Sequence, residues 1–376
     1  MEGAHEKLLH LTSAETEGID TPENAKTSSL QSSKFMLWLQ IFIFTFFVLA
    51  GQAAGTLLGR VYYEQGGNSR WIATLAQTAG FPILLPFICY PSPKNHNEQH
   101  DQLNIHQPSI FVRSSVYIFL GLFQVANSML YTVGLQYLPV STYSLISGSQ
   151  LAFNALTSFF LNGQKITPII LNSVVLLSFS SSAVIFQNET GDSGEISQTS
   201  LLIGFTVATF GSLGYALQFS LTELAFQKVF KSGSLKVVMK MSFFIGLFVT
   251  LTSFTELLMS GNWRDLEKEM GEYRSGKLAY VINLVCTATS WQLFAVGSVG
   301  LVFKASSLFS NVIINLGTSV GPIFGMVFLK ENMSGLKAFS LLLGLWGYAS
   351  YIYQHYLDDL EAKSGEVKSS AEDDDF

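Results

Sequence analysis

Amide, hydroxyl and phenol side chains recur at helical spacing inside four apolar segments of the chain. A polar group buried in lipid costs free energy unless it meets a partner or water, so such stripes favour a cavity between helices. Hydrogen bonding between helices is the simpler explanation for any one stripe, but four stripes together favour a binding site. The stripes comprise Gln124, Asn127 and Tyr131; Ser147, Gln150 and Asn154; Asn283, Thr287, Ser290, Trp291 and Phe294; and Ser307, Asn311, Asn315 and Thr318.

A cavity of this composition suits a neutral, planar, heteroaromatic ligand, because amides can bond to ring nitrogens and aromatic faces can stack on the ring. No pair of lysines or arginines lies in the middle of these segments, which disfavours phosphorylated or strongly anionic ligands. Trp291 and Tyr131 are each predicted to stack on the ring of the ligand, although a tryptophan at mid-helix can equally well serve to fill the core. The predicted substrate-binding set is Gln52, Asn127, Tyr131, Gln150, Asn154, Trp291, Gln292 and Asn311.

Glu223 is the acidic residue that the sequence places furthest inside an apolar segment. A partly buried carboxylic acid can bind and release a proton near neutral pH, which makes Glu223 a candidate for proton coupling. An ordinary ion pair with Lys228 or Lys231 is an equally open alternative. Glu256 lies close to the other boundary of its own segment and is interpreted as interfacial.

Ten apolar segments of about the length that a membrane-spanning helix needs would position these residues. The chain is 48% hydrophobic and 13% charged, whereas an average soluble domain is roughly a quarter charged. The composition therefore predicts an all-α integral membrane protein. The predicted spans are 35–59, 71–90, 115–137, 140–161, 167–186, 201–226, 237–259, 278–302, 305–328 and 336–356.

The spans form two groups of five, and an odd number of spans in each group requires the two groups to be inverted relative to each other. Inverted repeats are a signature of carriers that bind their substrate near the midplane. The predicted organisation is a polar, disordered tail (1–34), a first repeat (35–186), an extracytosolic loop (187–200), a second repeat (201–356) and an acidic tail (357–376). The distribution of lysine and arginine places both tails in the cytosol.

Two smaller patterns predict local packing. Gly51, Gly55 and Gly59 fall four residues apart on one helix face, a spacing that lets another helix approach closely. The mixed-charge stretch 263–277 is interpreted as a short interfacial helix.

The inventory of reactive residues disfavours an enzyme, a cofactor and a metal site. Both cysteines lie in apolar runs, and all six histidines lie in tails or loops. No glycine-rich nucleotide loop or catalytic triad spacing occurs in the sequence. Neither a metal ion nor a nucleic-acid partner is predicted.

Several stretches together resemble the plant purine permeases of the drug/metabolite transporter superfamily. They are residues 66–82, 137–146, 150–165 and 344–351, together with Leu221-Thr-Glu223-Leu and Trp291-Gln292. The resemblance covers 35–356 and implies ten helices in two inverted five-helix repeats. It also implies proton-driven uptake of adenine, related purines and cytokinins. The family has a Glu and a Trp-Gln pair where this chain has Glu223 and Trp291-Gln292, which strengthens their assignment.

The sequence thus predicts a secondary carrier that moves a neutral nucleobase-like solute into the cytosol with a proton. The plasma membrane is the family's commonest location, and endomembrane and vacuolar members also exist. Two alternatives stay open. One is a facilitator for another small neutral metabolite, such as an alkaloid or vitamin B6, and the other is a non-transporting ligand-binding receptor.

Overall fold

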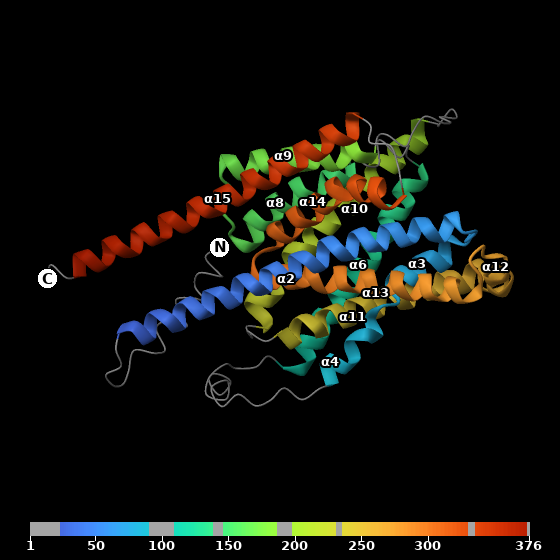
Figure 1. Cartoon of the computed structure of the whole chain (residues 1–376), viewed down its shortest axis with the longest axis horizontal. Helices are drawn as coiled ribbons and strands as arrows, with labels where there is room; N and C mark the ends of the chain where they lie inside the picture. Colours follow the sequence, from blue (N-terminus) through green and yellow to red (C-terminus); the bar gives the residue numbers. More distant parts are fainter. Residues whose placement is uncertain are drawn as a thin grey trace.

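The regular elements of the computed structural model are helical throughout the residues that it describes, which are 23–89, 109–137, 146–185, 198–230, 235–329 and 335–373. The helices run roughly side by side in one bundle (Figure 1). They are α2 (Glu23–Glu64), α3 (Arg70–Thr78), η1 (Phe81–Leu84), α4 (Leu85–Cys89), α6 (Ile110–Tyr137), α8 (Gln150–Asn162), α9 (Pro168–Ile185), α10 (Gln198–Leu224), η3 (Ala225–Phe230), α11 (Leu235–Ser260), η4 (Asn262–Asp265), α12 (Leu266–Glu272), α13 (Lys277–Lys304), α14 (Ser307–Leu329) and α15 (Gly335–Asp373).

Within the described ranges, six stretches are long and apolar enough to cross a membrane. Large apolar side chains on these helices face outward, including Phe111 at 80% exposure and Met259 at 83%. Such exposure suits a surface in contact with lipid rather than water. The chain is therefore an all-helical, multi-pass integral membrane protein. The six stretches are Phe35–Glu64, Arg70–Cys89, Ile110–Tyr131, Leu202–Phe230, Leu235–Ser260 and Lys277–Lys304.

The second apolar segment departs from the single helix expected over 71–90. α3 ends at Thr78, and the chain continues through the 3₁₀ turn η1 into the short helix α4. Pro82 and Pro86 lack backbone N–H groups and cannot complete a regular helix here. The hydroxyl of Thr250 on α11 donates to the Thr78 carbonyl at 2.7 Å, which satisfies one carbonyl freed by the break.

Other boundaries also differ from the predicted ones. α2 begins at Glu23, inside the expected tail 1–34, and α15 continues to Asp373, inside the expected tail 357–376. Helix hydrogen bonds are local, so a polar sequence can extend a helix that begins or ends in an apolar segment. Outside the described residues lie 1–22, Tyr90, 140–145 of the fourth predicted span, Phe186, 187–197 and Lys231.

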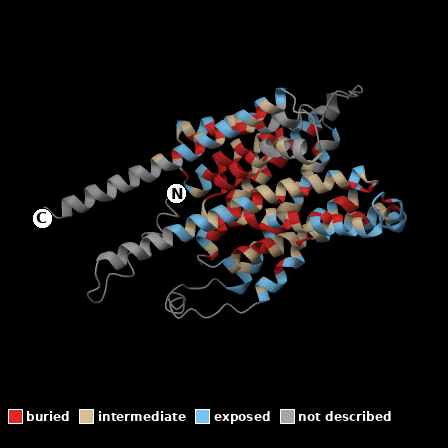
Figure 2. Cartoon of the chain, in the orientation of Figure 1, coloured by how far each residue is buried: buried red, intermediate tan, exposed pale blue. Residues whose placement is uncertain are grey.

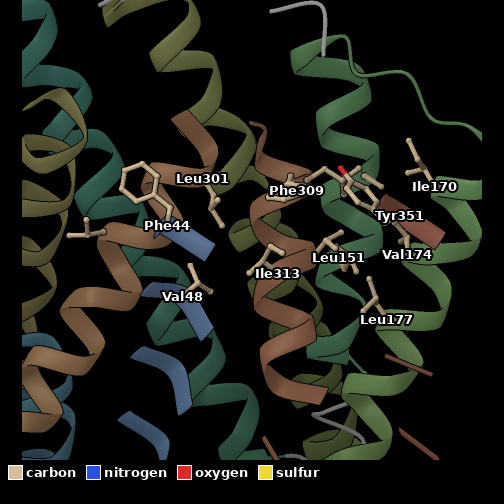
Figure 3. Packing of buried hydrophobic residues seen from close by; sticks show 14 of the residues in the cluster. Phe44, Val48, Leu151, Ile170, Val174, Leu177, Leu301, Phe309, Ile313 and Tyr351 are labelled. Carbon is tan, nitrogen blue, oxygen red and sulfur yellow. The ribbon is translucent and has the colours of Figure 1, made fainter. Parts of the chain in front are cut away.

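Buried residues gather in the middle of the bundle, and exposed ones cover its outer helices (Figure 2). The largest core cluster runs from Val48 on α2 through Ile313 on α14 to Leu177 on α9 (Figure 3). Because this cluster joins the N-terminal helix to helices from both halves of the chain, the two halves share one core.

α2 and α13 pack most closely through glycines. A Cβ added to Gly51 would lie 2.6 Å from the carbonyl oxygen of Ser290, and one added to Gly297 would lie 2.7 Å from that of Phe44. The close approach predicted from the glycine spacing is therefore present at Gly51. It does not extend to Gly59, where an added Cβ would meet nothing within 4 Å.

Candidate functional site

The predicted substrate-binding residues fall into three groups on neighbouring helices. Asn127 and Tyr131 of α6 and Gln150 and Asn154 of α8 lie against α10. Gln52 of α2 lies against α14, the helix that carries Asn311. Trp291 and Gln292 lie on α13. The contacts of each group decide which polar atoms remain available to a ligand.

The Tyr131 hydroxyl joins α6, α8 and α10. It donates to Gln150 Oε1 at 3.2 Å and shares a 3.0 Å hydrogen bond with the hydroxyl of Ser212. The Tyr131 ring stacks on Tyr215, with centroids 4.8 Å apart and an interplanar angle of 27°. Sequence reasoning did not single out Ser212, because a single serine in an apolar helix is common.

Two asparagines in this group differ in their unused atoms. Asn127 is 1% exposed, and its Nδ2 has no hydrogen-bond partner in the part of the chain that the structure covers. Asn154 is fully buried, and its Nδ2 donates to the Ala216 carbonyl at 3.1 Å and to the Ser220 hydroxyl at 3.2 Å. The Asn154 amide nitrogen is thus committed to helix packing, and only its Oδ1 is unpartnered among the described residues.

Gln52 of α2 contacts the far end of the polar stripe of α14. Its Nε2 donates to the Thr318 hydroxyl at 3.0 Å, whereas its Oε1 has no partner within the described ranges. Asn311 lies about two turns before Thr318 on α14. Its side chain is fully buried, and its Oδ1 accepts a hydrogen bond from Asn315 Nδ2 at 3.1 Å. The Nδ2 of Asn311 is unpartnered in the same ranges.

Trp291 and Gln292 contact different helices, although they are adjacent in sequence. The Trp291 indole packs against Gly55 of α2, and its ring meets Phe294 edge-on at 5.4 Å. Gln292 instead packs at Gly80, where the second segment breaks, and near Gly246 of α11. Successive helical residues point about 100° apart, so the pair does not act at one point. Trp291 Nε1 and Gln292 Nε2 both lack partners among residues described.

A glycine on a neighbouring helix faces each of several predicted side chains. An added Cβ on Gly214 would lie 2.0 Å from Asn127 Oδ1, and one on Gly317 would lie 2.2 Å from Gln52 Oε1. Glycine thus makes the space in which these amides lie. The sequence singled out Gly55 for helix packing but did not indicate the pairing of these glycines with site residues. The pairs are Gly55 with Trp291, Gly80 with Gln292, Gly211 with Tyr131, Gly214 with Asn127 and Gly317 with Gln52.

Glu223 lies where three helices meet. Its side chain is 7% exposed, and Oε2 accepts from Asn162 Nδ2 at 2.7 Å and from the backbone N–H of Ser307 at 2.9 Å. Oε1 accepts from Gln227 Nε2 at 3.1 Å. Ser307 is the first residue of α14, so the carboxylate faces the positive end of a helix dipole. The ion pair that the sequence left open as an alternative is not among these contacts: Lys228 is exposed, and Lys231 lies outside the described residues.

The described residues contain no group of three histidine, cysteine or acidic side chains that could hold a metal ion. Cys89 and Cys286 are both free and exposed. Most polar atoms gathered at the helix interfaces are neutral amides, hydroxyls and phenols; among the described residues, Glu223 and Glu269 are the buried carboxylates.

The fold and these contacts define a membrane protein of the transporter class, with neutral hydrogen-bonding groups buried between its helices. A family model described as purine nucleobase transmembrane transport matches residues 39–361. The chain belongs to this family, the purine permeases (PUNUT), and it is a purine nucleobase transmembrane transporter rather than an enzyme.

Relatives from Arabidopsis thaliana match almost the whole chain. Probable purine permease 10 is 45% identical over 341 residues, which cover 91% of this chain and 87% of that protein. Purine permease 21 is 44% identical, with coverage of 92% and 88%. One solved crystal structure has a TM-score of 0.51 at 15% identity and covers 83% of this chain and 95% of its own. That likeness supports the helical fold alone.

Proposed function

We propose that this transporter couples uptake to protons and that its substrates are adenine and related N-heterocycles, including cytokinins. The observation that carries the proposal is a set of buried polar atoms without hydrogen-bond partners in the described chain: Gln52 Oε1, Asn127 Nδ2 and Asn311 Nδ2. A buried polar atom left unsatisfied costs about 1–3 kcal/mol. A neutral heterocycle that offers both donors and acceptors would satisfy oxygen and nitrogen atoms of this kind together.

The other predicted residues take roles that follow from their present contacts. Tyr131 already stacks on Tyr215, so we assign its hydroxyl and Gln150, rather than its ring face, to the substrate edge. Trp291 supplies a ring face and an unused N–H group. Asn154 contributes through Oδ1 alone. Gln292, which faces the break after α3, is assigned to substrate contact from the other side of α13.

We further propose the ten-helix arrangement, with inverted repeats over 35–186 and 201–356 joined by 187–200. A helix lies within each predicted span, and the likeness to a solved structure over 83% of the chain supports a helical fold that also occurs in another protein. Both tails then lie in the cytosol, and the plasma membrane is the proposed location. The end of the bundle that holds Asn162, Glu223 and Ser307 is called the inner end below, and it faces the cytosol in this arrangement.

Glu223 is proposed as the proton-coupling residue, because it is a buried acid held only by neutral donors in the described chain. The test is uptake of radiolabelled adenine at external pH 5.5 and 7.5, in cells that lack their own purine carriers. We expect faster uptake at the lower pH, collapse on addition of a protonophore, and competition by an unlabelled cytokinin. A Glu223→Gln variant present at the membrane is expected to lose the pH dependence.

Each alternative gives a different result in this assay. An uptake rate that changes neither with pH nor with the protonophore would identify a facilitator, and binding without uptake would identify a receptor. Uptake by Glu223→Gln that still collapses with the protonophore would move the coupling site to another residue. Failure of cytokinin to compete would restrict the substrates to the nucleobases themselves.

A further inference from the structure

The ends of three helices meet at the Glu223 carboxylate. Asn162 is the last residue of α8, which stops there because Gly163 adopts a left-handed conformation with φ of 66°. Ser307 is the first residue of α14, where Ser306 caps the helix by accepting from the Phe309 N–H at 3.1 Å. Glu223 Oε2 accepts from both, from Asn162 Nδ2 and from the Ser307 N–H. One oxygen atom therefore links α10 to the end of α8 and to the start of α14.

The surrounding contacts between these helices are made by neutral groups. The hydroxyls of Ser158 and Ser307 are 2.8 Å apart, and those of Thr157 and Ser220 are 2.7 Å apart. The charged residues on adjoining segments are Lys165 after α8, Lys228 on η3 and Lys304 at the end of α13. Lys165 and Lys228 are exposed, and Lys304 lies over the Phe303 ring. Among the described residues of this junction, Glu223 is thus the buried group whose charge can change.

Protonation would alter this link for two physical reasons. An ionised carboxylate only accepts hydrogen bonds, whereas a protonated one carries a hydrogen on one oxygen and loses acceptor capacity there. The neutral acid also loses the attraction between a negative charge and the N-terminus of α14. In addition, the backbone of α10 changes to a π-helix over Ala225–Phe230, immediately after Leu224. Single π-turns are frequent at functional sites, and this one lies next to the link.

Building on the proposed proton coupling, we infer that Asn162 is a positioning residue that, with the first N–H of α14, makes Glu223 a charge-dependent link. In the charged state the link holds the inner ends of α8, α10 and α14 together. Proton binding releases the start of α14. The inner end can then open only when Glu223 is protonated.

Two substitutions remove donors that hold the Glu223 carboxylate. Asn162→Leu keeps a similar volume without an N–H group. Ser307→Pro removes the backbone N–H at the first helical position, where proline fits the helix well. Each has a matched control. Thr157→Val breaks a contact between α8 and α10 that does not touch Glu223, and Ser307→Ala removes the hydroxyl but keeps the N–H.

The measurement is adenine uptake across external pH, normalised to the protein present at the membrane. Loss of a donor disfavours the charged carboxylate, so protonation should occur at higher pH. We expect the midpoint of the uptake profile to rise by about one pH unit in Asn162→Leu and Ser307→Pro, as the loss of one charge-assisted hydrogen bond implies. Thr157→Val should keep the wild-type midpoint, and Ser307→Ala, which keeps the backbone N–H, should shift it less than Ser307→Pro does.

The outcomes separate this inference from the proposed function. A wild-type profile that is flat with pH would overturn proton coupling itself and the link with it. A pH-dependent wild type whose midpoint is unchanged in both donor-deletion variants would overturn the link alone. A rise that the Thr157→Val control shares would show a general effect of loosened packing and would also overturn the assignment of Asn162. If Asn162→Leu fails to reach the membrane, Ser307→Pro against Ser307→Ala decides the question.

Discussion

At the residue scale, glycine controls where the polar side chains of the site can lie. Asn127 occupies the space above Gly214, and Gln52 occupies the space above Gly317, each closer than a Cβ on the facing residue would allow. An amide at a helix interface normally holds the two helices apart. Against a bare glycine backbone it can lie within the interface, with one polar atom left for a ligand. The pairing thus explains how helices pack closely and still keep hydrogen-bonding groups in the protein interior.

Gly214→Ala tests this pairing. The new methyl group would meet Asn127 Oδ1 at 2.0 Å, so the asparagine must move or the helices must separate. Overpacking of this kind costs about 1–3 kcal/mol. We expect adenine uptake per molecule at the membrane to fall several-fold, with a lowered thermal unfolding temperature. Gly59→Ala is the matched control, because its added methyl group meets nothing within 4 Å; equal losses in both variants would contradict the pairing.

At the element scale, α12 is fastened to the ends of two long helices by one buried carboxylate. Glu269 accepts hydrogen bonds from the hydroxyl of Tyr62 on α2 and, at 3.1 Å, from that of Tyr280 on α13. The Tyr62 hydroxyl also donates a hydrogen bond, at 3.1 Å, to the carbonyl of Ser69, the residue that precedes α3. The expected interfacial segment 263–277 is therefore a turn, a short helix and an extended connection that together join α2, α3 and α13.

Glu269→Ala should lower the stability of this junction. Tyr280 would lose its acceptor, whereas Tyr62 would keep the Ser69 carbonyl, so the expected cost is about 1–3 kcal/mol for one buried phenol left unsatisfied. A lower thermal unfolding temperature in detergent is the expected result. Glu267→Ala removes an exposed acid from the same helix and should leave the unfolding temperature unchanged. Comparable decreases in both variants would show that the tyrosine contacts do not stabilise the junction.

At the scale of the whole molecule, the helices place α12 at the end of the bundle opposite the start of α2 and the end of α15 (Figure 1). In the proposed topology this arrangement puts α12 outside the cytosol and the inner end within it.

Cysteine labelling checks this orientation. In a variant without Cys89 and Cys286, a cysteine at Lys268 on α12 should react with a membrane-impermeant maleimide added to intact cells. A cysteine at Lys228 on η3 should react only after the membrane is permeabilised. Both positions are exposed, so access to the reagent depends on the side of the membrane. The reverse labelling pattern would invert the proposed topology.

Local patterns in the sequence determined the class of the protein and singled out the candidate residues of its site. Hydropathy over about 20 residues indicated the apolar helices, and helical spacing singled out the polar stripes. The isolated acid of the sixth predicted span identified Glu223. The family resemblance supplied the purine substrate, which the family match then confirmed. All of these signals lie within a single helix or in a short motif, so they need no knowledge of packing.

Only the tertiary structure decided which side chains face one another. Glu223 contacts Asn162, 61 residues away in sequence, and Ser307, 84 residues away. Trp291 and Gln292 are adjacent in sequence but contact different parts of the bundle. The same packing occupies the amide nitrogen of Asn154 and leaves that of Asn127 unused. Helical spacing fixes a residue's direction relative to its own axis. The rotation and depth of each helix against its neighbours come from the packing of all of them together, and this packing determines which polar atoms are left for a substrate.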